Sequence, residues 1–197
     1  MLQKQRKKYN HLHLTIQIMD KELTRKSKFL SLILRHDPSK AGIVLDKNGW
    51  ASVSEILKVT HLHKPELEQI VITNDKKRFE FNSDHSKIRA AQGHSIAVDV
   101  ELEETIPTND LYHGTASKYL ESILQFGITK QNRQHVHLSK DYPTALKVGS
   151  RHGTPEILVV DAVKMHQDGC KLYISSNGLY LTDYVAPQYL KKVLDEL

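Results

Sequence analysis

Three arginines stand beside the ends of predicted secondary-structure elements. Arg35, followed by His36, closes an amphipathic segment, Arg78 lies on a short predicted strand, and Arg151 follows a second amphipathic segment. Guanidinium groups stay charged and bind phosphate oxygens through two parallel hydrogen bonds. Three of them in such places are what a phosphate-handling site needs, although each alone also fits an ordinary role at a helix end or on the surface.

Histidines are the second group of candidates. His113 begins the motif His113-Gly114-Thr115 at the end of a predicted strand, where a glycine lets a ligand approach the backbone. Histidines spaced two apart share a face if they lie on a strand, and they occur at three places: His11 and His13, His61 and His63, and His135 and His137. No third ligand accompanies any pair at a fixed spacing, so we expect surface or packing histidines and no metal.

The charge of the chain is unevenly distributed. Its 197 residues carry 28 Lys and Arg against 23 Asp and Glu, for a formal charge of +5. Residues 1–100 hold 18 and 11 of these, a net of +7, whereas residues 101–197 hold 10 and 12, a net of −2. The two halves suggest two lobes with different partners, and the basic one fits a polyanion such as a nucleic acid.

Composition and missing motifs narrow the class further. The single cysteine, Cys170, excludes an internal disulfide framework and a cysteine-based zinc module. No apolar run approaches the roughly 20 residues that span a bilayer, and no secretory segment is recognisable. The glycine-rich nucleotide loops and the serine-hydrolase and zinc-protease motifs are also absent. We therefore expect a cytoplasmic protein with no membrane contact.

Helices dominate the start of the basic half. Apolar residues at helical spacing predict a helix over 24–35 that Thr24 begins and Asp37-Pro38 ends. The segment 42–53 reads as two short strands joined by the turn Asn48-Gly49. A capping box from Ser52 to Glu55 then opens a second helix.

The same half ends on a hairpin. Pro65 begins a third helix, with Leu67, Ile70 and Val71 on one face. The segments 76–82 and 87–91 form a β-hairpin. Three helices followed by a hairpin is the element order of a winged helix, a scaffold that commonly binds nucleic acids.

The pattern changes after the acidic stretch 100–110, which is the best candidate for a boundary. A predicted helix directs Leu120, Ile123 and Leu124 inward and stops at Gly127. The rest of this half is predicted to contain a strand at 135–139, a helix at 141–150, a buried strand at 156–162, a hairpin about Asn177-Gly178 and an amphipathic segment at 187–197 that packs on the sheet.

Seven motifs, taken in order, resemble the RNA 2′-phosphotransferase (KptA) family. They are LSLILRHDPSKAGIVLDKNGWASVSEIL, NDKKRFEF, IRAAQGHS, LYHGT, FGI, HVHLS and VGSRHG. The resemblance is colinear from about Ser27 to Val185, and the ordered set is far more specific than any one motif. The basic arm, residues 1–20, lies outside it.

The resemblance implies an α+β fold with two lobes. Residues 21–100 would form a winged-helix-like lobe that binds RNA, and residues 105–197 a mixed α/β lobe that resembles ADP-ribosyltransferases and binds NAD⁺. The implied enzyme moves an internal 2′-phosphate from tRNA-like RNA to NAD⁺, as in tRNA splicing or RNA repair. An ADP-ribosylated RNA intermediate would give 2′-OH RNA, nicotinamide and ADP-ribose 1″,2″-cyclic phosphate. We expect a monomer with NAD⁺ as co-substrate and no metal.

The resemblance also assigns residues. The family's essential Arg-His-Arg-Arg set falls on Arg35, His36, Arg78 and Arg151, all of the expected type. The arginines would clamp the phosphate, and His36 would either donate a hydrogen bond to it or assist proton transfer. The implied cofactor-binding residues are His113, Gly114, Thr115, Ser117, Gly127 and Ser139. His94 is a weaker candidate for the substrate site, since a buried, hydrogen-bonded histidine fits it equally well.

Two other functions stay open. The same scaffold could cap terminal phosphates of nucleic acid with ADP-ribose, or the chain could be a non-catalytic nucleic-acid binder. The intact His113-Gly114-Thr115 and Arg151 favour an enzyme. The late segment KLYISSNGLYL lacks the glutamate of the ADP-ribosyltransferases that modify proteins, which argues against that activity.

Overall fold

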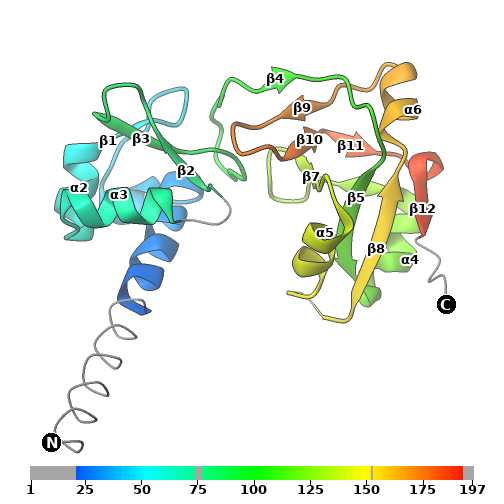
Figure 1. Cartoon of the computed structure of the whole chain (residues 1–197), viewed down its shortest axis with the longest axis horizontal. Helices are drawn as coiled ribbons and strands as arrows, with labels where there is room; N and C mark the ends of the chain where they lie inside the picture. Colours follow the sequence, from blue (N-terminus) through cyan, green and yellow to red (C-terminus); the bar gives the residue numbers. More distant parts are fainter. Residues whose placement is uncertain (1–20, 74–76, 152, 193–197) are drawn as a thin grey trace, which may run out of the picture. The chain divides into compact units, whose positions relative to one another are not determined.

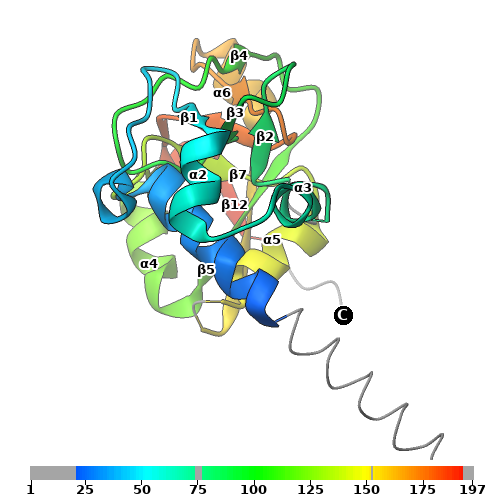
Figure 2. The same ribbon diagram turned by 90° about the vertical axis from the view of Figure 1, so that its left-hand side faces the viewer.

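The structure is a computed structural model that describes residues 21–73, 77–151 and 153–192. The chain divides into two compact units, Met1–Ala90 and Ala91–Leu197, which are drawn in Figure 1 and from a second side in Figure 2. Each is an α+β arrangement and is described by itself. The predicted arm at residues 1–20 and the pair His11 and His13 lie outside the described residues.

Unit 1 packs three helices on a small antiparallel sheet. Residues 21–35 are helical. The elements that follow are η1 (Pro38–Ala41), β1 (Ala51–Ser52), α2 (Val53–Thr60), α3 (Lys64–Ile72), β2 (Phe79–Phe81) and β3 (Lys87–Ala90). The strands lie in the order β1-β3-β2. Helices and sheet share one core, with fully buried side chains such as Leu30, Ile33, Ile56, Leu67 and Ile88.

Several local predictions for unit 1 are wrong in detail. Thr24 does not begin the first helix, because the chain is already helical at Lys21. No strand forms over 42–50, where the Asp46 carboxylate accepts hydrogen bonds from the backbone nitrogens of Asn48 and Trp50, each at 3.0 Å. Ser52 precedes α2 as predicted, but its hydroxyl makes no capping bond and lies 2.8 Å from that of Ser54.

The other elements of unit 1 are confirmed. The first helix stops at Arg35, before Asp37-Pro38, and Pro65 lies in the first turn of α3. Leu67 and Ile70 of α3 are buried. The hairpin of β2 and β3 pairs Phe79 with Ala90 and Phe81 with Ile88.

Unit 2 is built from short strands and helices in alternation. Its elements are β4 (Glu103–Glu104), β5 (Leu111–Ala116), α4 (Ser117–Phe126), β6 (Ile128–Thr129), β7 (Val136–Leu138), α5 (Tyr142–Gly149), β8 (Pro155–Val160), α6 (Ala162–Gln167), β9 (Tyr173–Ile174), β10 (Tyr180–Thr182), β11 (Tyr184–Val185), η2 (Pro187–Tyr189) and β12 (Leu190–Lys192). The strands pair in the orders β12-β8-β5, β4-β9-β10-β7 and β11-β6. A bridge between Tyr112 and Ser139 also joins β5 to the end of β7.

The core of unit 2 includes the central strand of one of its sheets. The predicted buried strand is β8, which lies between β5 and β12 and contributes Leu158 and Val160, neither of them exposed. Leu111, Leu138 and Met165 belong to the same core cluster as Val160. Helix α5 packs on β5, as Figure 1 shows.

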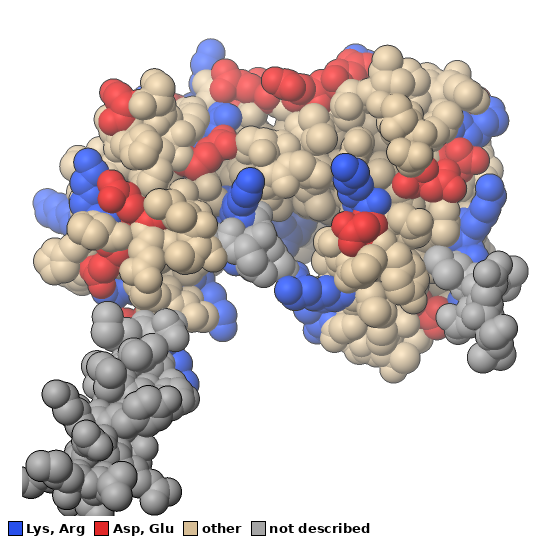
Figure 3. Space-filling model, viewed as in Figure 1, with Lys and Arg blue, Asp and Glu red and all other residues tan. Residues whose placement is uncertain are grey.

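Three features of unit 2 differ from the predictions. Leu124 does not face inward, because 43% of it is exposed on α4. Residues 190–192 of the C-terminal segment do not pack on a face of the sheet but extend it as the strand β12 along β8, and residues 193–197 of that segment lie outside the described residues. The acidic stretch 100–110 belongs to unit 2, where β4 pairs with β9, and Figure 3 shows its acidic side chains on the surface. Among the described residues, no helix is long and apolar enough to cross a membrane.

Candidate functional site

Two of the predicted catalytic arginines meet within unit 1. Arg35 is the last residue of the first helix and is only 8% exposed. Its Nη2 atom donates a hydrogen bond to the backbone oxygen of Arg78 at 3.3 Å, across 43 positions of sequence. Arg78 itself directly precedes β2 and is half-buried. The first helix and the hairpin therefore bring two guanidinium-bearing residues to one place.

His36 follows at the stop of the same helix. Its backbone nitrogen still donates to Leu32 oxygen at 2.9 Å, and its side chain is half-buried. The next residue, Asp37, accepts hydrogen bonds from the Ser39 hydroxyl at 2.6 Å and the Lys40 nitrogen at 3.2 Å. These bonds, that of Ser39 first, lower the pKa of Asp37, so its carboxylate caps η1 while charged. The chain direction after His36 is thereby fixed.

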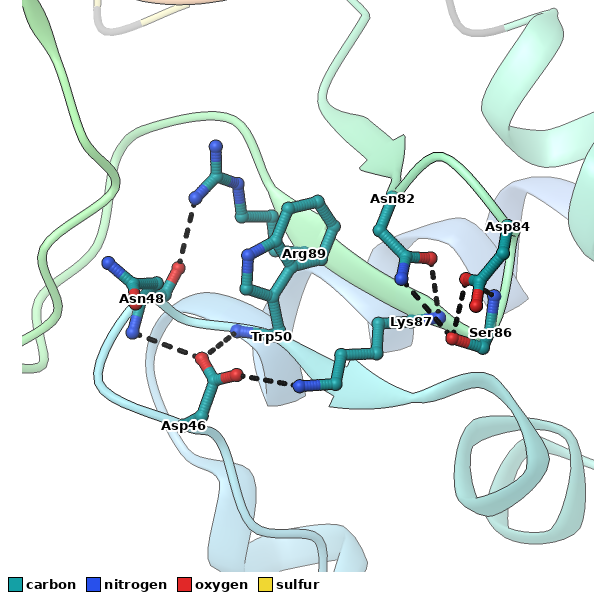
Figure 4. A network of polar contacts seen from close by, with 8 residues as sticks. All are labelled: Asp46, Asn48, Trp50, Asn82, Asp84, Ser86, Lys87 and Arg89. Atoms are coloured by element: carbon teal, nitrogen blue, oxygen red, sulfur yellow. Dashed lines mark hydrogen bonds and ion pairs between the residues drawn. The ribbon is translucent and has the colours of Figure 1, made fainter.

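A polar network supports the hairpin that carries Arg78 (Figure 4). Arg89 of β3 pairs with Glu80 of β2 at 2.6 Å, and its guanidinium lies 4.3 Å from the ring centre of Trp50. Lys87 pairs with Asp46 at 3.1 Å and so ties the turn before β1 to β3. Sequence reasoning missed this network, although the turn Asn48-Gly49-Trp50 and the alternating charges of the hairpin were visible signals.

His113 lies on β5 in unit 2. Its Nδ1 is 3.2 Å from the backbone oxygen of His137 on β7. Because a carbonyl oxygen only accepts, Nδ1 carries the proton and Nε2 is left as an acceptor. Burial lowers the pKa of His113, although the bond to His137 opposes this, and the ring is therefore neutral near pH 7. A neutral acceptor of this kind suits a hydroxyl group of a ligand.

Gly114 was expected to leave room for a ligand at the backbone, but helix α5 fills that side. A Cβ atom on Gly114 would lie 2.7 Å from the carbonyl carbon of Ala145 and 2.9 Å from the nitrogen of Gly149. The physical reason for the glycine is therefore close packing of helix on strand. The neighbouring Thr115 is buried, with 7% of it exposed.

The remaining predicted cofactor-binding residues occupy three different places. Ser117 begins α4, and both its nitrogen and its hydroxyl donate to Thr154 oxygen, at 2.9 and 3.1 Å. Gly127 ends α4 with a positive φ of 80°, and a Cβ there would lie 2.6 Å from the Tyr184 hydroxyl. Ser139 is buried and exchanges two backbone hydrogen bonds with Tyr112, at 2.7 and 2.8 Å. Ser139 thus lies next to His113, whereas Ser117 and Gly127 bracket α4.

The segment 92–98 is fastened to the residues before and within β7. His94 is 1% exposed, and its backbone oxygen accepts from the nitrogen of Gln134 at 3.1 Å. Arg133 donates to Gly93 oxygen at 2.9 Å, and Gln92 Oε1 lies 2.8 Å from His137 Nε2. His94 is thus a buried histidine. Gln92 contacts His137, whose backbone oxygen binds His113, so Gln92 is linked to His113 through one residue. Gln92 was not singled out from the sequence, although Gln92 lies in the motif IRAAQGHS.

Arg151 is the predicted catalytic residue in unit 2. It is exposed, and its nitrogen donates to Val148 oxygen at 3.2 Å in the turn that ends α5. The structure therefore divides the predicted set, with Arg35, His36 and Arg78 in unit 1 and Arg151 in unit 2.

The paired histidines have individual roles. His63 caps α3 in a reciprocal arrangement with Glu66, whose carboxylate accepts from the His63 nitrogen at 2.7 Å. His61 ends α2 with a positive φ of 52°. His135 lies against the ring of Tyr173, with centroids 6.2 Å apart. Within residues 21–73, 77–151 and 153–192, no group of three or more His, Cys, Asp or Glu side chains is arranged to hold a metal ion.

Comparison with known proteins places the chain in a family. The family model described as RNA 2′-phosphotransferase, Tpt1 / KptA family, matches residues 20–184. A protein of Flavobacterium johnsoniae named probable RNA 2′-phosphotransferase is 54% identical over 170 residues, which are 84% of this chain and 93% of that protein. Proteins with the same name from Trichormus variabilis and Fusobacterium nucleatum are 50% and 48% identical, over 83% and 88% of this chain and 93% and 99% of their own lengths.

The match covers both units and every predicted site residue, and the relatives are aligned over nearly their whole lengths. Their shared name is that of a transferase. The chain belongs to the Tpt1/KptA family of RNA 2′-phosphotransferases, which is a family of enzymes.

Proposed function

We propose that this protein removes an internal 2′-phosphate from RNA by transferring it to NAD⁺. The products are RNA with a 2′-OH, nicotinamide and ADP-ribose 1″,2″-cyclic phosphate. Membership of the family supports this proposal. We propose that Arg35, His36, Arg78 and Arg151, which all lie within the matched residues, are the Arg-His-Arg-Arg set that the resemblance implies. The observation that carries most weight is the bond from Arg35 to the backbone oxygen of Arg78, because it joins two proposed phosphate-binding residues that lie 43 positions apart in the sequence.

Two lobes with separate tasks fit this reaction. We propose that unit 1, with its helices and three-stranded sheet, is a winged-helix-like lobe that holds tRNA-like RNA, and that unit 2 is an ADP-ribosyltransferase-like lobe that holds NAD⁺. Unit 2 offers suitable groups, since the neutral His113 has an accepting Nε2 for a ribose hydroxyl. We expect the protein to act as a monomer in the cytoplasm and without a metal.

The first step joins RNA to ADP-ribose. A 2′-phosphate oxygen attacks the anomeric carbon beside nicotinamide, the glycosidic bond breaks and neutral nicotinamide leaves through an oxocarbenium-like state. Two polyanions must approach each other for this attack. Arg35, Arg78 and Arg151 would offset their repulsion and hold the nucleophile in line.

The second step releases the RNA. The adjacent 2″-hydroxyl of the ribose attacks the new phosphodiester, its proton is removed, and the RNA 2′-oxygen leaves and is protonated. Positioning and charge stabilisation dominate such a phosphoryl transfer. His36 would either donate a hydrogen bond to the phosphate or carry one of these protons.

The test is incubation of an oligonucleotide bearing a labelled internal 2′-phosphate, with and without NAD⁺. We expect the label to leave the RNA only with NAD⁺ and to appear in ADP-ribose cyclic phosphate. Failure of the label to leave the RNA at high enzyme concentration would refute the proposal. A product that keeps ADP-ribose on a terminal phosphate would instead support the capping reaction.

Variants test the residues. Arg35→Ala, His36→Ala, Arg78→Ala and Arg151→Ala should each slow turnover, and those that act in the second step should accumulate ADP-ribosylated RNA. Arg25→Ala is the matched control, because Arg25 is an exposed arginine of the same helix as Arg35. If the four variants turn over like this control, the site assignment is wrong.

A further inference from the structure

Helix α5 and strand β5 touch through their backbones. Ala145 and Gly149 lie four residues apart and so on one face of α5, where they meet Gly114 and Thr115 of β5. A Cβ on Gly149 would lie 2.7 Å from Thr115 oxygen and 3.2 Å from its nitrogen. A Cβ on Gly114 would in turn meet the backbone of Ala145 and of Gly149 itself. We call this contact of Gly114, Thr115, Ala145 and Gly149 the glycine seam.

Gly149 is not explained by backbone conformation. Its φ is not positive, so the left-handed turn that selects glycine at many helix ends is not formed here. Alanine is the better helix former at such a position. The close approach of Thr115 is therefore the reason for a residue without a side chain.

The seam lies two residues from Arg151. Beyond Arg151, the backbone oxygen of Thr154 accepts hydrogen bonds from the nitrogen and the hydroxyl of Ser117, at 2.9 and 3.1 Å, where α4 begins directly after β5. The described residues Gly149 and Thr154, on either side of Arg151, thus contact β5 and the start of α4 respectively. Arg151 itself is exposed, so few side-chain contacts of its own can fix it.

We propose that Gly149 is a positioning residue for Arg151. By letting α5 lie directly on β5, the glycine seam determines where the Arg151 guanidinium stands relative to His113 and Thr115. The inference rests on the proposed function, in which Arg151 binds phosphate and His113 binds NAD⁺. Gly114 would then also help to position Arg151, because it is the residue of β5 against which Ala145 and Gly149 pack.

Gly149→Ala is the direct perturbation. An ordinary contact of the new Cβ begins near 3.4 Å, so α5 must retreat by about 0.7 Å from the 2.7 Å available beside Thr115. Since a misplacement of about 1 Å can cost on the order of 100-fold in rate, we expect kcat for 2′-phosphate transfer to fall by about 10- to 100-fold.

A double-mutant cycle separates positioning from general damage. If Gly149 acts through Arg151, Gly149→Ala should have almost no further effect once Arg151→Ala is present, so the two losses should not multiply. Losses that do multiply would overturn the inference, as would full activity of Gly149→Ala. If the wild type is active and Arg151→Ala is equally active, the inference is also overturned. If the wild type does not transfer the 2′-phosphate at all, the proposed function itself is refuted.

Two further variants complete the design. Ser150→Ala changes the exposed residue between Gly149 and Arg151, removes only a hydroxyl bonded to Leu146 oxygen and should keep kcat near the wild-type value. Should Gly149→Ala fail to fold, as judged by thermal melting, Ala145→Gly removes a buried methyl group and makes the backbone of α5 more flexible at the same seam, without a clash. It should lower kcat in the wild-type background and leave Arg151→Ala unaffected, and equal losses in both backgrounds would overturn the inference.

Discussion

Replacing Arg89 by alanine tests whether the contacts of Arg89, of which Figure 4 draws those with Asn48 and Trp50, hold unit 1 together. Arg89 joins three parts of that unit, because it pairs with Glu80 of β2, covers the ring of Trp50 and donates to Asn48 oxygen at 3.4 Å. The side chains of Arg89 and Glu80 are 12% and 25% exposed, so water screens their pairing only in part. Their loss should therefore cost more than that of a surface pair.

The expected magnitude follows from the contacts that disappear. Removing the charged partner of a largely buried carboxylate costs about 1–3 kcal/mol, and a cation–π contact at a partly exposed site contributes about 0.5–1 kcal/mol. We expect the free energy of unfolding of unit 1 to fall by about 1.5–4 kcal/mol. The loss of the Asn48 contact, which is long, adds little.

The assay uses the only tryptophan of the chain. Trp50 lies in unit 1, so its fluorescence during urea unfolding reports on that unit. Lys87→Ala is the matched control, because Lys87 is on the same strand and its pair with Asp46 is half-exposed, at 50% and 38%. The control should lose less than about 1 kcal/mol. Equal, small losses for both variants would refute the reasoning from burial.

Three further predictions concern unit 2, Arg35 and metals. The pKa of His113 is lowered in the folded state, so its protonation opposes folding; the stability it contributes is complete above its unfolded pKa and is lost as pH falls below that value. The melting temperature should therefore drop more between pH 7.5 and pH 5.5 for the wild type than for His113→Gln. These two pH values lie about one unit on either side of 6.5, the ordinary pKa of histidine. Equal drops in melting temperature for the two proteins would contradict this prediction. Arg35→Lys keeps the charge but loses the forked geometry by which Arg35 would bind phosphate while it donates to Arg78 oxygen, so kcat should fall by about 10-fold or more, and a wild-type rate would show that charge alone suffices. Prolonged treatment with a chelator should leave turnover unchanged, and a loss restored by one divalent metal would overturn the expectation of a metal-free reaction.

Elements with strong local signals were predictable from the sequence. Helix α5 begins as expected, with the Asp141 carboxylate accepting from Thr144 nitrogen at 2.8 Å, and the hairpin about Asn177-Gly178 is confirmed by the pairing of β9 with β10. In both cases the residues that decide the structure are neighbours in sequence.

Features that depend on distant contacts were not predictable in this way. The segment 42–50 has residues suited to strands, but the Asp46 carboxylate binds nearby backbone nitrogens, Val44 is 79% exposed, and no described strand pairs with this segment. Gly114 looked like an opening for a ligand, because nothing local shows that α5 will lie against it. Residue type and position singled out Arg35, Arg78, Arg151 and His113, but only the family resemblance joined them into one site, and their roles stay predictions.

The position of β12 has a consequence for folding during synthesis. β8 pairs with β5 on one side and with β12 on the other, yet β12 follows β8 by 30 positions, from Val160 to Leu190. A ribosome would therefore expose β8 with one open edge until residues 190–192 emerge, and open edges recruit other strands. The described strands of unit 1 do not wait for a distant partner in this way, because β3 pairs with both β1 and β2 and is complete at Ala90. Truncation before Leu190 should thus promote aggregation through unit 2 while leaving the hairpin of unit 1 intact.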